Sequence, residues 1–324
     1  MTLVASAVAD QVLGDLEQHR RELTGFCYRM LGSGAEAEDA VQETFVKAWR
    51  SADRFEGRSS LRTWLFRIAH NVCIDMSRSP QRRARPVDLG PARPPDPEHL
   101  AEVLPEDRWI TPVADEAVID LTGDPASVAA ARDSIRLAFV AALQRLPARQ
   151  RAALVLCEVL AWPARDVAEL LDASVASVNS ALQRARATLA SAPAVETPEL
   201  TPDQEELLAR YVDAFERYDM DALAALLHDD AIQSMPPYAM WLQGRDDLLA
   251  WYAGPGAACA GSRLLPGGAN GCPAFAQYRA DPAGGHSPWA LQVLELRRDR
   301  IAAVHSFLDT GESFERLGFP AHLD

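Results

Sequence analysis

Cysteine is scarce in this chain of 324 residues, which contains five. The five are scattered, and no two stand at the C-x-x-C spacing that zinc sites and redox motifs use. The sequence therefore predicts neither a disulfide framework nor a metal site, and we expect no cofactor. Unpaired thiols are typical of a reducing compartment, so the expected location is the cytoplasm.

Long apolar runs are also lacking. No stretch approaches the roughly 20 apolar residues that a membrane-spanning helix needs. Residues 1–10 are apolar, but they lack a basic start and end in Asp10, so they do not resemble a signal peptide. We therefore expect no membrane contact.

Lysine is nearly absent, since Lys47 is the single lysine among 32 basic residues, and the acidic residues outnumber the basic ones to give a net charge of −14. Such a charge is unfavourable for binding DNA phosphates. The acidity is concentrated, however: residues 89–131 hold nine acidic and two basic residues, and residues 193–324 hold 20 and nine. Residues 1–88 and 132–192 carry +1 and +3, so these two segments can contact DNA, although weakly when alone.

Helical periodicity comes first along the chain. Residues 11–32 and 35–49 each have an apolar face, and a glycine-rich turn separates them. On the apolar face of residues 35–49 we expect Trp49 to be a core residue. The opposite face carries three polar residues at i, i+3 and i+4, namely Asp39, Gln42 and Glu43.

A second amphipathic segment follows a turn at residues 55–60. It begins at Leu61, and its apolar residues recur at spacings of three and four, with Trp64 expected in the core. Its polar side presents about one residue per turn: Arg67, Asn71, Asp75 and Arg78. A carboxylate patch beside a helix with arginine and amide groups suggests a protein contact next to a nucleic-acid reader.

Residues 38–49, followed by residues 60–75 (SLRTWLFRIAHNVCID), resemble region 2 of extracytoplasmic-function (ECF) sigma factors. These are the small promoter-specificity subunits of bacterial RNA polymerase. The resemblance implies that the face formed by Asp39, Gln42 and Glu43 docks on the coiled coil of the polymerase's largest subunit. The alternative for these charges is an ordinary solvated helix face.

The same resemblance implies that this region opens the −10 element and captures an unstacked base. Such a pocket needs aromatic or amide groups together with basic residues for the phosphates. The candidates for the −10 element are Phe55, Arg58, Ser60, Arg62, Asn71, Asp75 and Arg78.

Residues 87–130 are rich in proline and acidic residues, which predicts an extended and poorly ordered linker. Trp109 is its conspicuous apolar anchor. In the family that the sequence resembles, the corresponding linker runs towards the RNA path of the polymerase.

Helical patterning resumes at residue 131 and is broken at Pro147. Helices are expected over residues 150–160, 164–171 and 175–189, with a tight turn before the last one, which is helix-turn-helix architecture. The strings LPARQR at 146–151 and DVAELL at 166–171 resemble sigma region 4. A helix-turn-helix used only for protein packing is the alternative.

The resemblance implies that the last of these helices reads the −35 element. The residues in reading positions are Ser174, Ser177, Asn179, Ser180, Gln183, Arg184 and Arg186. Asn179 and Ala181 stand where basic residues are common in the family, so we expect a modest affinity for the −35 element.

The pattern changes after a linker at residues 193–203. Two amphipathic helices are followed by alternating strands, of which 289–296 and 301–309 form an expected antiparallel hairpin. Residues 204–320 are therefore an α+β domain. Residues 209–215, 223–230, 244–245 and 307–309 resemble the cone-shaped SnoaL-like, ketosteroid-isomerase-like fold. This fold encloses a pocket, and a subset of ECF sigma factors carries it.

On the last strand His305, Phe307 and Asp309 share one face. The residues expected to line a pocket are Tyr211, Trp241, Tyr278, Trp289, His305 and Asp309. His305 and Asp309 are titratable and would be needed for catalysis. The alternatives are plain core packing, ligand sensing, or contact with the helical domains or polymerase.

The predicted fold is multidomain, with two all-α helical modules followed by an α+β cone. Its parts are region 2 (11–86), an acidic linker (87–130), region 4 (131–192), a second linker (193–203) and the SnoaL-like domain (204–320). The expected partners are core RNA polymerase and promoter DNA, and the need for an anti-sigma factor stays open. We expect that the protein is not an enzyme and that its acidic cone regulates it, either by restraining the helical domains or by tuning core and promoter binding. The charge of the cone suits a contact with the basic faces that carry Arg78–Arg85 or Arg184–Arg186.

Two other functions remain open. One is a stand-alone repressor that uses only the helix-turn-helix and binds duplex DNA tightly without polymerase, which the weak basicity disfavours. The other is a helix-turn-helix regulator fused to a ligand-binding or isomerase- or cyclase-like domain, whose turnover would depend on His305 or Asp309.

Overall fold

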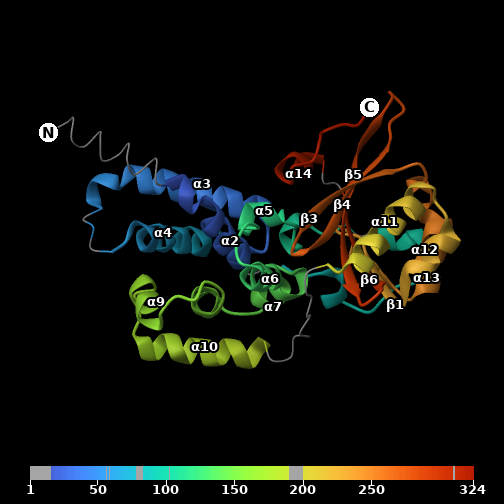
Figure 1. Cartoon of the computed structure of the whole chain (residues 1–324). Coiled ribbons are helices and arrows are strands. Elements are labelled where there is room, and N and C mark those ends of the chain that lie inside the picture. The colour runs from blue at the N-terminus through green and yellow to red at the C-terminus, as the bar shows by residue number, and fades with distance from the viewer. Residues whose placement is uncertain are drawn as a thin grey trace. The chain divides into compact units, whose positions relative to one another are not determined.

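The computed structural model describes residues 16–55, 57, 59–77, 83–101, 103–189, 200–308 and 311–324. The described chain divides into two compact units (Figure 1). The first consists of the residues up to Arg83 and those from Asp115 to Leu189. The second consists of Ala84–Ala114 and the residues from Leu200 onwards. The segment between the two helical regions is therefore shared between the units.

The first unit opens with three long helices and two short 3-10 turns. Their bounds are η1 Glu17–His19, α2 Arg20–Leu31, α3 Gly34–Arg50, η2 Ala52–Arg54 and α4 Leu61–Met76. Gly32 ends α2 in the left-handed region at φ 74°, where glycine has no steric penalty. The side chains of Ser33 and Ser60 cap α3 and α4 by accepting backbone N–H groups of the first turn.

The rest of the first unit is built from shorter helices. They are α5 Asp115–Val118, α6 Pro125–Asp133, α7 Leu137–Gln144, α8 Ala148–Leu154, the π-helical η6 Val155–Val159, α9 Ala164–Leu170 and α10 Val175–Leu189. Pro147 precedes α8, where a missing N–H costs nothing. The turn after α9 passes through Asp172 at φ 49°, and Ala173 N–H bonds Ala168 O at 2.9 Å. The pair α9–α10 forms the expected helix-turn-helix.

Two buried arginines join α2 to the second half of this unit. Arg29 donates to Ser134 O at 3.2 Å and to Ser134 Oγ at 2.6 Å. Arg151 donates to Met30 O and, at 2.9 Å, to Leu143 O. Burial lowers the pKa of Arg29 to about 10, which leaves it charged at neutral pH. The first helices of this unit and those after α6 are therefore packed together through buried, hydrogen-bonded cations.

The second unit is a six-stranded sheet with helices on both faces. Its strands are β1 Leu227–Ser234, β2 Trp241–Gln243, β3 Arg263–Ala269, β4 Cys272–Ala280, β5 His286–Arg297 and β6 Arg300–Leu308. The order is β2-β1-β6-β5-β4-β3, in which β1 and β6 are parallel and the other neighbours antiparallel. The predicted hairpin is β5–β6. The predicted fold class, all-α modules followed by an α+β domain, is confirmed.

The helices of the second unit pack from two sides. Its helices are α11 Pro202–Glu216, α12 Met220–Leu226, α13 Arg245–Ala253, η7 Pro255–Cys259 and α14 Gly311–Arg316. The first three bury a core with β1, β4, β5 and β6 that includes Phe215, Leu248, Phe275 and Val304. Phe314 of α14 packs on Tyr278 from the opposite face of the sheet, with ring centroids 5.1 Å apart.

Residues Ala84–Ala114, which we call the strap, are held by the sheet of the second unit. The strap contains η3 Pro86–Asp88, η4 Pro97–Ala101 and η5 Glu106–Arg108. Arg93 N–H donates to Trp241 O of β2 at 2.8 Å, and Leu104 N–H donates to Pro237 O at 3.1 Å. At the other edge strand, β3, Ala114 bridges Ala269. The strap therefore runs from one edge of the sheet to the other.

These contacts correct the prediction of a poorly ordered linker over residues 87–130. The first part is the strap, and the remainder forms α5 and the start of α6 in the first unit. The strap also bonds itself near its two ends, where Ala84 N–H donates to Arg108 O at 2.9 Å and Ile110 N–H donates to Ala84 O at 3.3 Å. We call this pair of bonds the clasp. Trp109, 2% exposed, is buried beside it.

None of the helices within the described ranges is long and apolar enough to span a bilayer. Within the same ranges no group of histidine, cysteine, aspartate and glutamate residues could hold a metal ion.

Candidate functional site

The outer face of α3 is exposed, while its inner face packs on α2 and α4. Asp39, Gln42 and Glu43 are exposed, and Val46 and Trp49 continue the same face at 39% and 56% exposure. These five residues, which we call the α3 face, follow the helical spacings i, i+3, i+4, i+7 and i+10. Glu43 pairs with Lys47 at 3.4 Å, an exposed pair that contributes little stability.

The exposure of Trp49 corrects the prediction that it is a core residue. Ala48, one position earlier, is fully buried, so the core-facing stripe of α3 ends beside Trp49 and does not include it. The sequence signal was present, because Gln42, Val46 and Trp49 recur at spacings of four and three. A large exposed aromatic next to carboxylates on a rigid helix is typical of a protein-binding surface.

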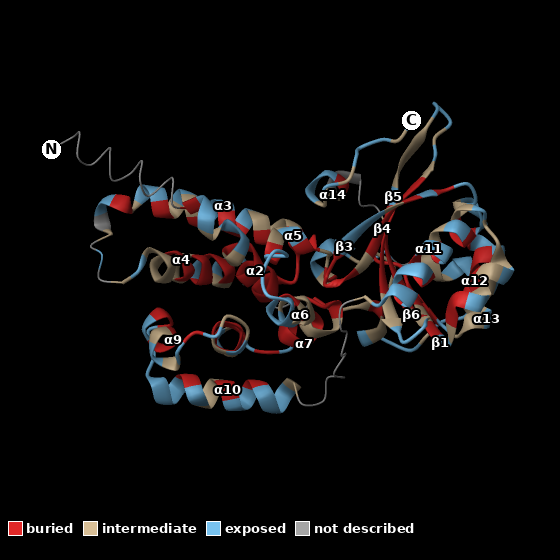
Figure 2. Cartoon of the chain, viewed as in Figure 1, coloured by how far each residue is buried: buried red, intermediate tan, exposed pale blue. Residues whose placement is uncertain are grey.

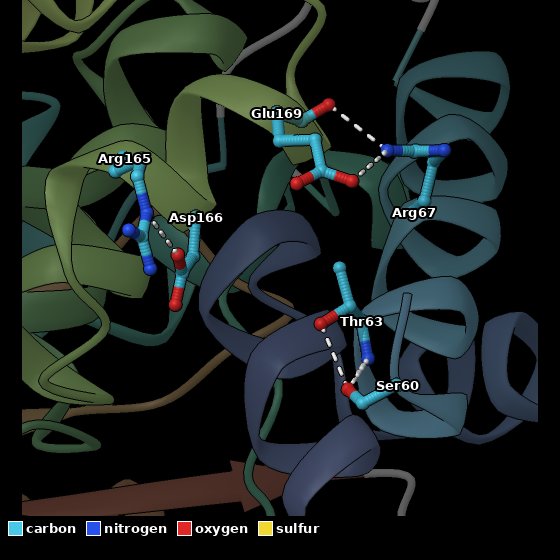
Figure 3. A network of polar contacts seen from close by, with 6 residues as sticks. All are labelled: Ser60, Thr63, Arg67, Arg165, Asp166 and Glu169. Atoms are coloured by element: carbon cyan, nitrogen blue, oxygen red, sulfur yellow. Dashed lines mark hydrogen bonds and ion pairs between the residues drawn. The ribbon is translucent and has the colours of Figure 1, made fainter. Parts of the chain in front are cut away.

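The candidates for the −10 element lie around the start and the polar side of α4. Ser60 Oγ accepts Thr63 N–H at 3.1 Å and lies 2.9 Å from Thr63 Oγ1 (Figure 3). Phe55 is half-buried against Trp64, with ring centroids 4.9 Å apart. Asn71 and Asp75 are exposed. Arg58 and Arg78 lie outside the described residues.

The remaining candidate, Arg62, is engaged inside the first unit. Its guanidinium pairs with Glu22 and stacks 4.3 Å from the ring centre of Trp162, which precedes α9. Phe66 contacts the same ring, with centroids 5.0 Å apart.

One turn further along α4, Arg67 Nη2 donates to Glu169 O at 3.0 Å and lies 3.7 Å from Glu169 Oε1 (Figure 3). Part of the polar side of α4 is thus covered by the helix-turn-helix.

The candidates for the −35 element lie along α10 and its N-terminal turn. Val178, Leu182 and Ala185 are buried, and the opposite side is exposed (Figure 2). The exposed candidates are Ser174, Ser177, Asn179, Gln183, Arg184 and Arg186, and Ser180 is half-buried. The structure therefore brings the predicted residues together on one solvent-facing side, as a groove-reading helix requires.

The basic groups near α10 are partly engaged with neighbours. Arg184 Nη1 donates to Ser180 Oγ at 2.6 Å, and Arg186 Nη2 pairs with Glu158 at 2.5 Å. Arg165 on α9, which the sequence reasoning did not single out, has a side chain 87% exposed beside Asp166 at 3.3 Å (Figure 3). In a helix-turn-helix the first helix crosses the DNA backbone, which makes this arginine a further candidate for a phosphate contact.

The second unit encloses a cavity of about 610 Å³ between its helices and its sheet. Trp289 belongs to its wall, as predicted from the sequence, and Asp309 lies outside the described residues. Four other predicted residues, Tyr211, Trp241, Tyr278 and His305, are not among the described residues that line it.

The error at His305 has a simple geometric cause. Ser306 and Leu308 line the cavity, and since successive side chains of a strand point to opposite faces, His305 points the other way. There its Nδ1 lies 2.8 Å from Ser234 Oγ and its Nε2 3.4 Å from Glu295 Oε1. Tyr278 shares that opposite face, against Phe314, and the Trp241 indole donates to Gly90 O of the strap at 2.9 Å.

The sequence reasoning missed three glutamines in the cavity wall: Gln233, Gln277 and Gln292. Each is 2% exposed. Gln277 and Gln292 each stand in an otherwise largely apolar stretch of strand, which is the signal that could have revealed them, whereas the strand of Gln233 also holds His228, Asp229 and Asp230. Tyr211 contributes indirectly, because its hydroxyl donates to Gln292 Oε1 at 2.8 Å.

Comparison with known families matches all three parts of the chain. The Sigma-70 region 2 family matches residues 16–83, the Sigma-70 region 4 family residues 136–189, and the SnoaL-like domain family residues 208–304.

The chain is also similar to characterised proteins over most of its length. It is 43% identical to the ECF RNA polymerase sigma factor SigG of Mycobacterium tuberculosis over 328 aligned residues, which cover 97% of this chain and 86% of that protein. It is 31% identical to SigJ of the same species over 67% of this chain and 62% of SigJ. The crystal structure of SigJ shares the fold, with a TM-score of 0.59 at 22% identity, over 95% of this chain and 99% of that one.

Proposed function

The chain belongs to the ECF family of RNA polymerase sigma factors, and we propose which of its surfaces make the contacts that such a factor needs. As a sigma factor it binds core RNA polymerase and promoter DNA and promotes the initiation of transcription. The observation that carries the assignment is the α3 face, where two carboxylates and an amide adjoin an exposed valine and a tryptophan that is 56% exposed.

We assign the α3 face to core polymerase. Its C-terminal end has Trp49, and tryptophan is one of the residue types enriched among energetic hot spots of interfaces. Asp39 and Glu43 give it negative charge, which suits a basic partner surface and speeds encounter. The α3 face is free to meet a partner in the first unit as it stands.

We assign the polar side of α4 to the −10 element and α10 to the −35 element. The −10 set is Phe55, Arg58, Ser60, Arg62, Asn71, Asp75 and Arg78, and the −35 set is Ser174, Ser177, Asn179, Ser180, Gln183, Arg184 and Arg186. We add Arg165 of α9 as a phosphate contact. The low net positive charge of both regions supports delivery to DNA by the polymerase, because few phosphates can be neutralised by the factor alone.

The first unit is a closed form that must open on the promoter. Elements named for positions −10 and −35 are about 25 base pairs apart, roughly 85 Å along B-DNA at 3.4 Å per base pair. In the closed form α4 contacts the helix-turn-helix through Arg62, Arg67 and Glu169. The two readers cannot span both elements until these contacts break.

The strap supports a regulatory role for the second unit. While the clasp is formed, Ala84 and Trp109 are neighbours, and the six residue steps from Trp109 to Asp115 reach about 20 Å at most. A released strap of residues 84–114 could instead extend to roughly 100 Å. The cone therefore limits the separation of regions 2 and 4 by holding the strap.

We assign a regulatory role to the cone, and no catalytic role. The described residues that line its cavity include no aspartate, glutamate or histidine. Burial raises the pKa values of Cys259 and Tyr252, which keeps both protonated at neutral pH and unsuited to act as bases. We place the protein with its polymerase in the cytoplasm.

Reconstituted run-off transcription with purified core polymerase tests the assignment of the α3 face. The double variant Asp39→Arg/Glu43→Arg should lose core binding and transcription by roughly 100-fold or more, since two charges are reversed in one interface. The matched control is Glu206→Arg on the exposed side of α11, which should transcribe like the unaltered chain. Equal transcription by the double variant and the control would refute the assignment.

A further inference from the structure

The cavity of the second unit has the size and composition of a small-molecule site. Its volume of about 610 Å³ lies within the roughly 300–1,000 Å³ of typical ligand pockets. Its walls are mainly apolar and aromatic, with Phe215, Trp251 and Trp289 among them. The polar groups that reach it are few and come from neighbouring strands.

Two directed chains of hydrogen bonds fix those polar groups. In the first, Tyr211 donates to Gln292 at 2.8 Å, Gln292 to Gln277 at 2.9 Å, and Gln277 to Ser262 at 3.0 Å. The amides are therefore oriented before any ligand arrives, which lowers the entropic cost of binding.

In the second chain, Tyr252 donates to Gln233 Oε1 at 2.7 Å, and Gln233 Nε2 donates to Ser306 Oγ at 2.9 Å. An amide nitrogen carries two hydrogens, and these bonds use one each on Gln233 and Gln292. One further N–H of each glutamine remains for an acceptor. The wall is thus built to donate to a carbonyl or hydroxyl oxygen.

The charge of the cavity wall further restricts the class of ligand that fits. Among its described residues Arg279 is the one permanent ion, and its guanidinium lies 4.2 Å from the ring centre of Trp289. With no described carboxylate to balance it, a cation would meet repulsion, while an anionic group could pair with Arg279.

The strap completes the cavity. Leu100 and Val103 contribute to the wall, and the neighbouring Leu104 N–H holds the strap to Pro237 O at 3.1 Å. Val103 is 58% exposed, so a bound molecule would cover apolar surface that now faces solvent. A ligand in this cavity contacts both the sheet and the strap.

We propose that the cavity binds an apolar ring molecule with a carbonyl or hydroxyl oxygen, uncharged or with one negative charge, and that its binding stabilises the docked strap. The regulatory consequence rests on the function proposed above: the ligand keeps regions 2 and 4 from separating and lowers transcription. A ligand at 100 times its dissociation constant stabilises the form that binds it by about 2.7 kcal/mol, or roughly 100-fold.

Fluorescence titration of the full chain with N-phenylnaphthylamine, a neutral apolar dye, tests the site. Ala258 belongs to the cavity wall at an exposed position, so the larger side chain of the variant Ala258→Trp can occupy part of the cavity. This variant should bind the dye roughly tenfold or more weakly than the unaltered chain. The matched control is Ala257→Trp, an exposed neighbour outside the described wall, which should bind the dye like the unaltered chain. Equal affinities of the two variants would refute the cavity as the site.

Two matched pairs of compounds test the ligand class. Tetralone should displace the dye roughly tenfold better than tetralin, which has the same rings without the carbonyl oxygen. The sulfonated dye, anilinonaphthalene sulfonate, should lose roughly fivefold in affinity with Arg279→Leu, while the neutral dye is unaffected. Equal displacement by tetralone and tetralin would contradict the role of the glutamines, and an unchanged sulfonate affinity that of Arg279.

Hydrogen exchange of the strap tests the coupling without any transcription. At saturating dye the amides of Arg93 and Leu104 should exchange up to roughly 100-fold more slowly, and Ala258→Trp should abolish the change. Unchanged or faster exchange would overturn the coupling. A chain that transcribes normally but fails this test refutes only the inference, whereas loss of polymerase binding by the unaltered chain refutes the proposed function.

Discussion

The two polar faces of region 2 differ in what covers them. The α3 face has Asp39, Gln42 and Glu43 exposed beside Trp49. On α4, by contrast, Arg62 stacks on Trp162 and Arg67 bonds Glu169 of the helix-turn-helix. Within the first unit, the surface assigned to polymerase is open, and part of the surface assigned to DNA is covered.

This difference suggests an order of events. Polymerase can bind the α3 face without any rearrangement of the first unit. DNA can meet all of α4 only after the helix-turn-helix has moved away. A factor built in this way stays off free DNA, in agreement with its weakly basic regions, and becomes a promoter reader on the enzyme.

The largest effect is expected on the open face. Trp49→Ala should weaken core polymerase binding roughly 30-fold, because truncating a hot-spot tryptophan of an interface costs at least about 2 kcal/mol. Stability should change by less than about 0.5 kcal/mol, since the side chain is mostly in solvent. Competition for labelled core polymerase and urea unfolding measure the two quantities. A stability loss without an affinity loss would show that Trp49 is a packing residue.

A second effect of similar size is expected on α4, in the pH dependence of the unfolding free energy. His70, on α4, is 7% exposed, and burial together with Arg149 lowers its pKa from 6.5 to about 4. The unfolded chain therefore binds a proton that the folded chain refuses, so stability is full above about pH 6.5 and is lost as pH falls towards 4. Between pH 7.5 and pH 5 the loss from this group should be about 2 kcal/mol.

The comparison of the unaltered chain with His70→Leu isolates this contribution. Leucine has a similar size and no titration, so the difference in unfolding free energy between the two proteins should shift by about 2 kcal/mol over that pH range. A constant difference across the range would mean that His70 is free to protonate in the folded chain.

The smallest effect is expected at the edge of the covered face. Glu169→Ala removes the carboxylate 3.7 Å from Arg67 but keeps the backbone carbonyl that accepts its hydrogen bond. Because the pair is exposed, less than about 1 kcal/mol should be lost, and binding of the free chain to a single-stranded −10 oligonucleotide should rise by no more than roughly fivefold. Glu116→Ala, at an exposed position of α5, is the control that removes the same charge and leaves Arg67 paired. A larger rise with the control than with Glu169→Ala would contradict the covering role of this contact.

The sequence predicted the parts of this molecule that local patterns determine. Spacings of three and four predicted α2, α3, α4 and the helix-turn-helix, and alternation predicted the β5–β6 hairpin. For β6, the prediction of which side chains face the cavity was wrong. This strand is buried on both sides, so apolar alternation could not tell Ser306, which lines the cavity, from His305, which does not.

The strap shows the same limit at longer range. Its prolines and acidic residues correctly suggest a segment without long helices or strands, but composition carries no information on distant backbone partners. The bonds that hold it, from Arg93 to Trp241 and from Leu104 to Pro237, join residues more than 100 positions apart. Trp49 is a different case, because its spacing from Gln42 and Val46 matched the exposed face of α3, and its large apolar side chain was nevertheless taken for a core residue.

The most direct test of the central claim is the distance between regions 2 and 4 with and without polymerase. Spin labels at Arg50, at the end of α3, and at Ala187, on the exposed side of α10, report it in a chain whose half-buried Cys157 and Cys259 are replaced by serine. We predict one short distance in the free chain and, on core polymerase with promoter DNA, an increase of several tens of ångströms towards the roughly 85 Å between the promoter elements. The same distance in both states would contradict the account.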